Sequence, residues 1–159
     1  LQKIKIFMRI LLFFLVVGFV SCQNENKKEV YHSFNNNTWN TDSIVSFELD
    51  NIDTTSSHDL YLMVRHTTNF KFQNLFLFTN FENQQDTLEL FLSEKSGRWL
   101  GKGFGEIKEL KIRIKENVNF KENQDQIFSV EQAMRYEDLE KIINLTEIVA
   151  VGIGLYKSE

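Results

Sequence analysis

The chain has 159 residues, of which 42% are hydrophobic and 13% aromatic, and its formal net charge is −4. That length suffices for one domain with a sizeable core, and a second domain is not expected. An acidic chain without a cluster of Lys and Arg is a poor partner for nucleic acid, because binding to phosphates needs grouped basic side chains.

The first 22 residues have the three parts of a bacterial lipoprotein signal. The opening basic residues are Lys3, Lys5 and Arg9. An uninterrupted apolar run follows at 10–20, and Ser21 stands directly before Cys22. As a helix the run would span roughly 16 Å, which is too short for a hydrocarbon core of about 30 Å. We therefore predict a cleaved signal peptide at 1–21 and a lipid on Cys22, the only cysteine in the chain.

Residues 22–38 are predicted to be a lipidated polar tether between the membrane and the folded body. The segment is rich in Asn, Lys and Glu, and its apolar interruptions are only Val30, Tyr31 and Phe34. Such a composition buries too little apolar surface to fold by itself. The domain is therefore predicted over 39–159.

Seven segments of this domain have the length and pattern of strands. They lie at 44–49, 60–65, 75–78, 88–92, 110–115, 127–134 and 147–156. The clearest alternates Leu110, Ile112 and Ile114 with charged residues, as a half-buried strand does. Polar residues 82–85 suit a hairpin loop, and only 136–144 has apolar residues at helical spacing. We predict an all-β fold, an antiparallel two-sheet β-sandwich of about seven strands, with one short helix near 136–144.

Glycines occur in two notable places, one inside the last predicted strand and one between two predicted strands. Gly152 and Gly154 interrupt the last strand, where a bulge or a close backbone approach is expected. The segment RWLGKGFGE at 98–106 has three glycines, but their spacing does not match a nucleotide-binding loop and no helical pattern follows. A turn softened by glycine is the preferred interpretation.

No combination of residues predicts catalysis, a metal or a cofactor. The three histidines, His32, His58 and His66, lack the spacing of zinc ligands, and no serine elbow or phosphate-cradling loop occurs. We therefore expect no enzyme activity and no small-molecule substrate. An envelope hydrolase stays open as an alternative, and it would need two facing carboxylates in a cleft.

Six segments, taken in order and spacing, resemble the gliding-motility lipoprotein family GldH of the Bacteroidetes. They are WNTDSIVSFELDNIDTT (39–55), FQNLFLF (72–78), DTLELFL (86–92), GRWLGKGFGEIKE (97–109), KENVNF (115–120) and VEQAMR (130–135). The resemblance implies a lipid-anchored envelope component that supports gliding and its coupled protein secretion, and that acts by contacting other envelope proteins.

The partner contact is predicted at Arg98 and Trp99, because Arg and Trp are enriched in binding hot spots. The alternative for Trp99 is a side chain buried as a plug of the core. A carbohydrate-binding surface lipoprotein is the rival function, with Trp39, Trp99 and Tyr61 as a stacking platform for sugars. Residues 23–28 lack an acidic run that would direct the protein to the cell surface. We therefore predict the periplasmic side of the outer membrane.

Overall fold

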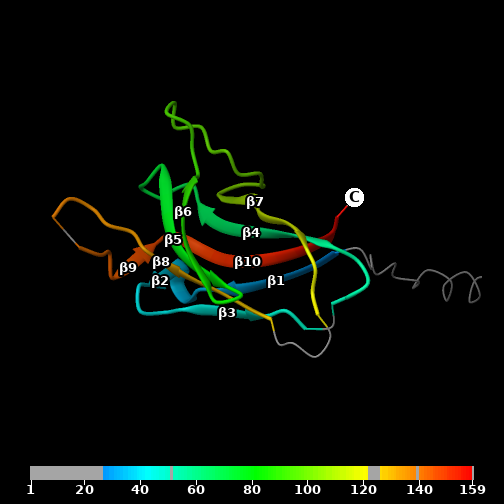
Figure 1. Ribbon diagram of the computed structural model, residues 1–159. Helices are drawn as coiled ribbons and strands as arrows, with labels where there is room; N and C mark the ends of the chain where they lie inside the picture. Colours follow the sequence, from blue (N-terminus) through cyan, green and yellow to red (C-terminus); the bar gives the residue numbers. More distant parts are fainter. Residues whose placement is uncertain (1–26, 51, 122–125, 139, 159) are drawn as a thin grey trace, which may run out of the picture.

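The structure is a computed structural model, which describes residues 27–50, 52–121, 126–138 and 140–158. The predicted signal peptide and Cys22 lie outside the described residues. Ten strands and one 3₁₀ turn form the described part of the chain (Figure 1). In chain order they are β1 (Lys27–Ser33), η1 (Asn35–Asn37), β2 (Thr38–Asn40), β3 (Val45–Glu48), β4 (His58–Thr67), β5 (Asn74–Phe81), β6 (Gln84–Phe91), β7 (Ile107–Val118), β8 (Ile127–Gln132), β9 (Asn144–Thr146) and β10 (Ile148–Lys157).

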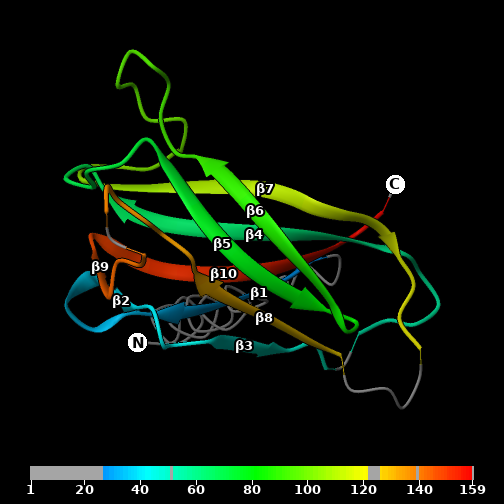
Figure 2. The ribbon, with the colours of Figure 1, turned by 60° about the vertical axis from the view of Figure 1, so that its left-hand side comes forward.

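Two four-stranded sheets make the body of the molecule. One has the order β1-β10-β4-β7, which we call sheet A, and the other has the order β3-β8-β5-β6, which we call sheet C. The short strands β2 and β9 form a separate pair. Figure 2 shows β5 and β6 crossing obliquely over the strands of sheet A. Each of these strand pairs is antiparallel. The predicted antiparallel two-sheet sandwich is confirmed.

The core lies between the two sheets. Alternate residues of β4 point inward, so Leu60, Leu62 and Val64 have no exposed surface. They meet apolar side chains of sheet C, among which Leu75 and Leu77 are also fully buried. The same alternation leaves the odd-numbered residues of β4 on the outer face of sheet A.

A tight hairpin joins β5 to β6, as the polar sequence at 82–85 predicted. Glu82 and Asn83 form the turn, and both have positive φ angles, of 53° and 60°. Two successive residues in this conformation make a type I′ turn, whose twist matches that of the flanking strands. The seven predicted strands all exist, as β3 to β8 and β10.

The tether prediction is wrong for residues 27–33. Instead of a solvated linker they form β1, which pairs with β10 over seven residues, from Lys27 opposite Tyr156 to Ser33 opposite Ala150. The segment escaped prediction because it is an edge strand with polar side chains on both faces. Its backbone hydrogen bonds, and the packing of Tyr31, hold it in the sheet.

The helix predicted near 136–144 is absent from the described residues of that segment. Asn144 already begins β9, and the residues before it form turns. Glu137 has a positive φ of 52°, which an α-helix does not accommodate. Ile142 donates its backbone N–H to the carbonyl of Met134, so this segment closes a loop beyond the end of β8. Residue 139 lies outside the described residues.

Candidate functional site

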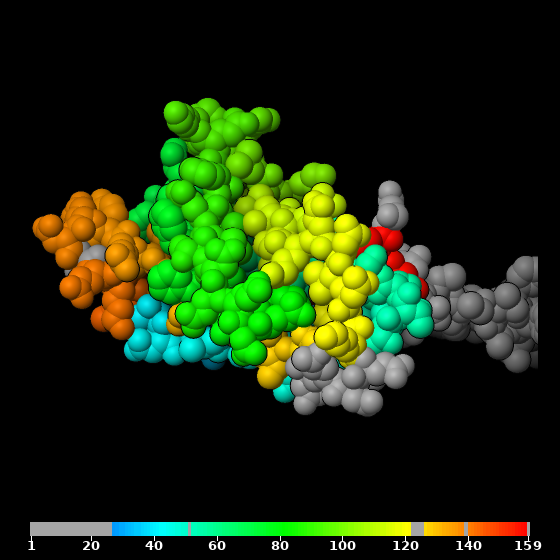
Figure 3. All heavy atoms as spheres, in the orientation of Figure 1, coloured from blue at the N-terminus to red at the C-terminus, as the bar shows by residue number. Residues whose placement is uncertain are grey.

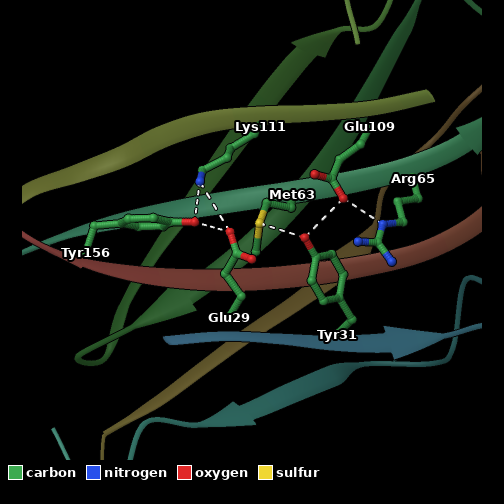
Figure 4. Close-up of polar contacts among 7 residues, drawn as sticks. All are labelled: Glu29, Tyr31, Met63, Arg65, Glu109, Lys111 and Tyr156. Carbon is green, nitrogen blue, oxygen red and sulfur yellow. Dashed lines mark hydrogen bonds and ion pairs between the residues drawn. The ribbon is translucent and has the colours of Figure 1, made fainter. Parts of the chain in front are cut away.

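The outer face of sheet A carries a cluster of tyrosines and charged side chains from all four of its strands (Figure 4). We call it the outer cluster, and its members are Glu29 and Tyr31 of β1, Met63 and Arg65 of β4, Glu109 and Lys111 of β7, and Tyr156 of β10. They meet because the register aligns one residue of each strand across the sheet, for example Tyr31, Gly152, Met63 and Lys111. The strand alternation then turns the same set outward on every strand.

Glycines in β10 make room for two of the tyrosine rings. A Cβ atom on Gly152 would lie 2.5 Å from Cδ1 of Tyr31, and one on Gly154 would lie 2.9 Å from Cε2 of Tyr156. A side chain at either position would force the neighbouring ring to shift, so both rings lie close against the backbone of β10. The close approach predicted at these glycines is confirmed, whereas the irregularity of the β10 register lies between Ile148 and Ala150.

One half of the outer cluster is built around Glu109. Tyr31 donates its hydroxyl to Oε2 of Glu109 at 3.0 Å, and Arg65 donates Nε–H to the same oxygen at 2.6 Å. The guanidinium carbon of Arg65 also lies 3.9 Å from the centroid of the Tyr31 ring, a cation–π distance. Burial and the bond to Glu109 raise the pKa of Tyr31 to about 12. The hydroxyl is therefore a protonated donor at neutral pH.

The other half is built around Glu29. Tyr156 donates its hydroxyl to Glu29, and Lys111 donates to the hydroxyl oxygen of Tyr156 and to Oε1 of Glu29, the latter at 3.3 Å. The ammonium of Lys111 lies 3.7 Å from the Tyr156 ring centroid, and the Tyr61 ring meets that ring edge-on at 5.0 Å. The bond from Tyr156 lowers the pKa of Glu29, while burial raises the pKa of Tyr156.

These contacts hold the side chains of the outer cluster in fixed positions, as a preorganised binding surface would require. Its two carboxylates and two cations balance, and the raised pKa values of Tyr31 and Tyr156 keep their hydroxyls protonated at neutral pH. Tyr, Arg and Met are the residue types enriched where proteins bind one another. Because the side chains are already held by one another, binding costs them little conformational entropy.

The predicted contact residues Arg98 and Trp99 lie on the loop between β6 and β7, which is fastened to β7 at the edge of sheet A. Arg98 is exposed and pairs with Glu94, while Trp99 is half-buried with its ring centroid 4.6 Å from that of His66. Backbone hydrogen bonds between Lys102 and Glu109 fasten the loop to β7. Glu109 therefore connects the loop to the outer cluster. The partner contact at Arg98 and Trp99 stays a prediction.

The proposed sugar platform of Trp39, Trp99 and Tyr61 is wrong. Trp39 has no exposed surface and stacks on Phe34 with 4.7 Å between ring centroids. Tyr61 lies elsewhere, on the outer face of sheet A beside Tyr156. The three rings thus share no exposed face, and the carbohydrate-binding alternative is not favoured.

The histidines are dispersed. His66 is fully buried, and its Nδ1–H donates to the carbonyl of Thr67 at 2.8 Å. Its Nε2 finds no hydrogen-bond partner among the described residues, and burial lowers the pKa of the ring. No group of three or more His, Cys, Asp and Glu that could hold a metal ion occurs in the described ranges. Nor does the described part of the chain contain a helix long and apolar enough to cross a bilayer.

Most of the outer cluster was missed from the sequence. Glu29 and Tyr31 fall in the predicted tether, and Lys111 falls on the charged, outward face of a predicted strand. The signal that could have found them is the period of two in VGIGLY at 151–156, where small residues alternate with apolar ones. Glycine at every second position of a strand leaves space that large side chains of neighbouring strands can fill.

Comparison with known proteins gives a consistent result. The family model described as GldH lipoprotein matches residues 26–155. The chain is 40% identical over 153 residues to the "Gliding motility lipoprotein GldH homolog" of Christiangramia forsetii, covering 92% of this chain and 93% of the relative. It is 36% identical over 103 residues to the "Gliding motility lipoprotein GldH" of Flavobacterium johnsoniae, covering 60% and 65% respectively. No solved structure gives a significant match.

Proposed function

Because the chain belongs to the GldH lipoprotein family, we propose that it serves gliding motility and the protein secretion coupled to it as a lipid-anchored component of the cell envelope. In this role it docks other envelope proteins and performs no catalysis, so it needs neither a cofactor nor a small-molecule substrate. The observation that supports the docking role is the outer cluster, a surface with two tyrosines, one arginine and one methionine that spans all four strands of sheet A.

The anchor is the acylated Cys22, the only cysteine of the chain. Two or three acyl chains, each contributing about 0.8 kcal/mol per buried methylene, hold such a protein at the membrane essentially permanently. The proposed location is the periplasmic side of the outer membrane, which the absence of an acidic run at 23–28 favours.

Because the protein is confined to a membrane, a docking surface of low affinity is enough to bind a partner. Partners in the same membrane meet at a high effective concentration, so each contact can be weak in solution. Partner choice then depends on the arrangement of side chains such as Tyr31 and Arg65, which are held in fixed positions by Glu109.

The test is complementation of a strain that lacks the gene. A chain with Tyr61→Ser and Arg113→Ser changes side chains that border the outer cluster without removing a member of it. We expect it to accumulate in the envelope but to lose spreading on agar and secretion. A matched control with Phe78→Ser on the outer face of sheet C should restore both. Normal spreading and secretion by the first variant would contradict docking through sheet A.

A further inference from the structure

We infer that the end of the sandwich at which β1 begins faces the membrane, with the strands of sheet A rising from the lipid surface. This end, called the near end, holds Lys27 of β1, Lys157 of β10, His58 of β4 and Val118 of β7, which the registers place side by side. The inference rests on the lipid at Cys22 in the proposed function, and it adds how the domain is oriented.

Sheet C shares the same near end. Lys115 near the end of β7 donates to Gln84 at the start of β6, at 3.4 Å. The rings of Phe81 and Phe120 pack edge-on with 6.4 Å between centroids. The β5–β6 turn and the segment after β7 therefore lie at the end where β1 starts, and Figure 2 shows these parts together on its right-hand side.

Chain length sets the distance between this end and the lipid. Cys22 and Lys27 are five residues apart, and an extended chain spans at most about 3.6 Å per residue, so they are at most about 18 Å apart. Strand β4 has ten residues, about 33 Å at the rise of a strand. An inverted domain would lift Lys27 by that length above the lipid, which the chain cannot span.

The faces of the sandwich disfavour a domain lying flat. Sheet C directs three carboxylates outward, from Glu48, Glu89 and Glu131, and burying carboxylates against lipid is costly. The outer face of sheet A carries the ion-paired outer cluster. An upright domain leaves both faces in water.

The distribution of apolar side chains agrees with this orientation. The structure describes ten exposed large hydrophobic residues, and seven of them lie at or beyond the opposite end, called the far end: Ile44, Phe91, Leu100, Phe104, Ile107, Tyr136 and Ile143. Phe104 is completely exposed on the loop between β6 and β7, which projects from the body in Figures 1 and 3. Exposed apolar residues gathered in this way are typical of a surface that contacts another protein.

The near end is charged but internally balanced. Lys28 pairs with Asp50 at 2.5 Å, and Lys157 pairs with Asp53 at 2.8 Å. Because these charges already neutralise one another, attraction to anionic lipid contributes little, and the covalent anchor sets the orientation. The orientation should therefore be insensitive to salt.

Energy transfer to lipid tests the orientation in vesicles that contain no other protein, so failure of docking cannot affect the result. The acylated protein is given one new cysteine, Thr55→Cys or Lys121→Cys at the near end, or Phe104→Cys or Ile143→Cys at the far end, all at exposed positions. Each is labelled with a maleimide dye and placed in vesicles of phosphatidylcholine and anionic phosphatidylglycerol, with an acceptor on some headgroups.

We expect at least about twofold more energy transfer from the near-end labels, given the strand length, and no change at high salt. Equal transfer from both ends, or more from the far end, would overturn the inference. The parent chain should stay unlabelled because acylation occupies its only thiol, and a labelled parent that does not bind vesicles would remove the anchor on which the inference depends. A variant with a long Gly/Ser insertion after Gln23 should lose the difference between the ends. A difference that persists there would contradict the part assigned to chain length.

Discussion

At the scale of single residues, the outer cluster depends on two positions of β10 that have no side chain. Gly152 and Gly154 have no side chains, and the rings of Tyr31 and Tyr156 occupy that space. Each ring then places its hydroxyl on a carboxylate of another strand, Glu109 or Glu29. The arrangement could be predicted only in part from the sequence, because a glycine indicates a close approach without identifying the side chain that makes it.

Replacing Gly152 with Ala should destabilise the fold through Tyr31. The new Cβ would meet the Tyr31 ring at 2.5 Å and the carbonyl oxygen of Val30 at 2.8 Å, and crowding of this kind costs about 1–3 kcal/mol. Chemical denaturation measures the loss. In the double variant with Tyr31→Ala the two effects should not add, because the ring is gone. Additive losses would show that the ring does not occupy this space.

Buried histidines should make stability depend on pH. Burial lowers the pKa of His66 and of His58 from the ordinary value of 6.5. The unfolded chain therefore binds protons at a higher pH than the folded chain. The free energy of unfolding should be highest above about pH 6.5 and should fall as the pH decreases below that value.

Urea denaturation between pH 7.5 and about pH 5 measures this slope, above the range in which carboxylates titrate. The variant His66→Phe should have a shallower slope, while His32→Gln, at an exposed position, should keep the slope of the parent chain. A slope unchanged by His66→Phe would contradict the assignment.

At the scale of elements, the sequence predicts strands well where one face is buried. The alternation reflects full burial of Leu60, Leu62 and Val64 in β4 and partial burial of the apolar residues of β7, and the pattern is visible without the structure. Strand β1 has no such alternation, because its pairing with β10, and not burial of one face in the core, holds it in the sheet. Strands β2 and β9 are three residues each, too short for any period to appear. The helix predicted near 136–144 is wrong because loop residues can have apolar side chains at helical spacing by chance.

Removing β1 should therefore damage the domain. A chain that begins at Thr38 loses the seven-residue pairing with β10 and the packing of Tyr31, and we expect it to be less stable by about 2–4 kcal/mol. It also exposes the edge of β10, which favours association. Thermal unfolding and gel filtration compare it with a chain that begins at Lys27. Equal melting temperatures and equal elution volumes would show that β1 is dispensable.

At the scale of the whole molecule, the predicted sandwich is confirmed, and the family was identified from motifs spread over the domain. The members of the outer cluster could not be predicted to the same degree. Glu29 and Tyr156 are 127 residues apart in the chain, and only the register of sheet A brings them together. Arg98 and Trp99 are predicted as a partner contact from their residue types alone, yet Trp99 packs partly against the core.

The claim that the domain docks partners through sheet A is tested most directly by photocrosslinking in living cells. A photoreactive phenylalanine replaces Tyr61, which borders the outer cluster, or Phe78 on the outer face of sheet C. We expect a discrete adduct with an envelope protein from position 61, its loss when Cys22→Ala removes the anchor, and no such adduct from position 78. An adduct from position 78 alone would contradict docking through sheet A.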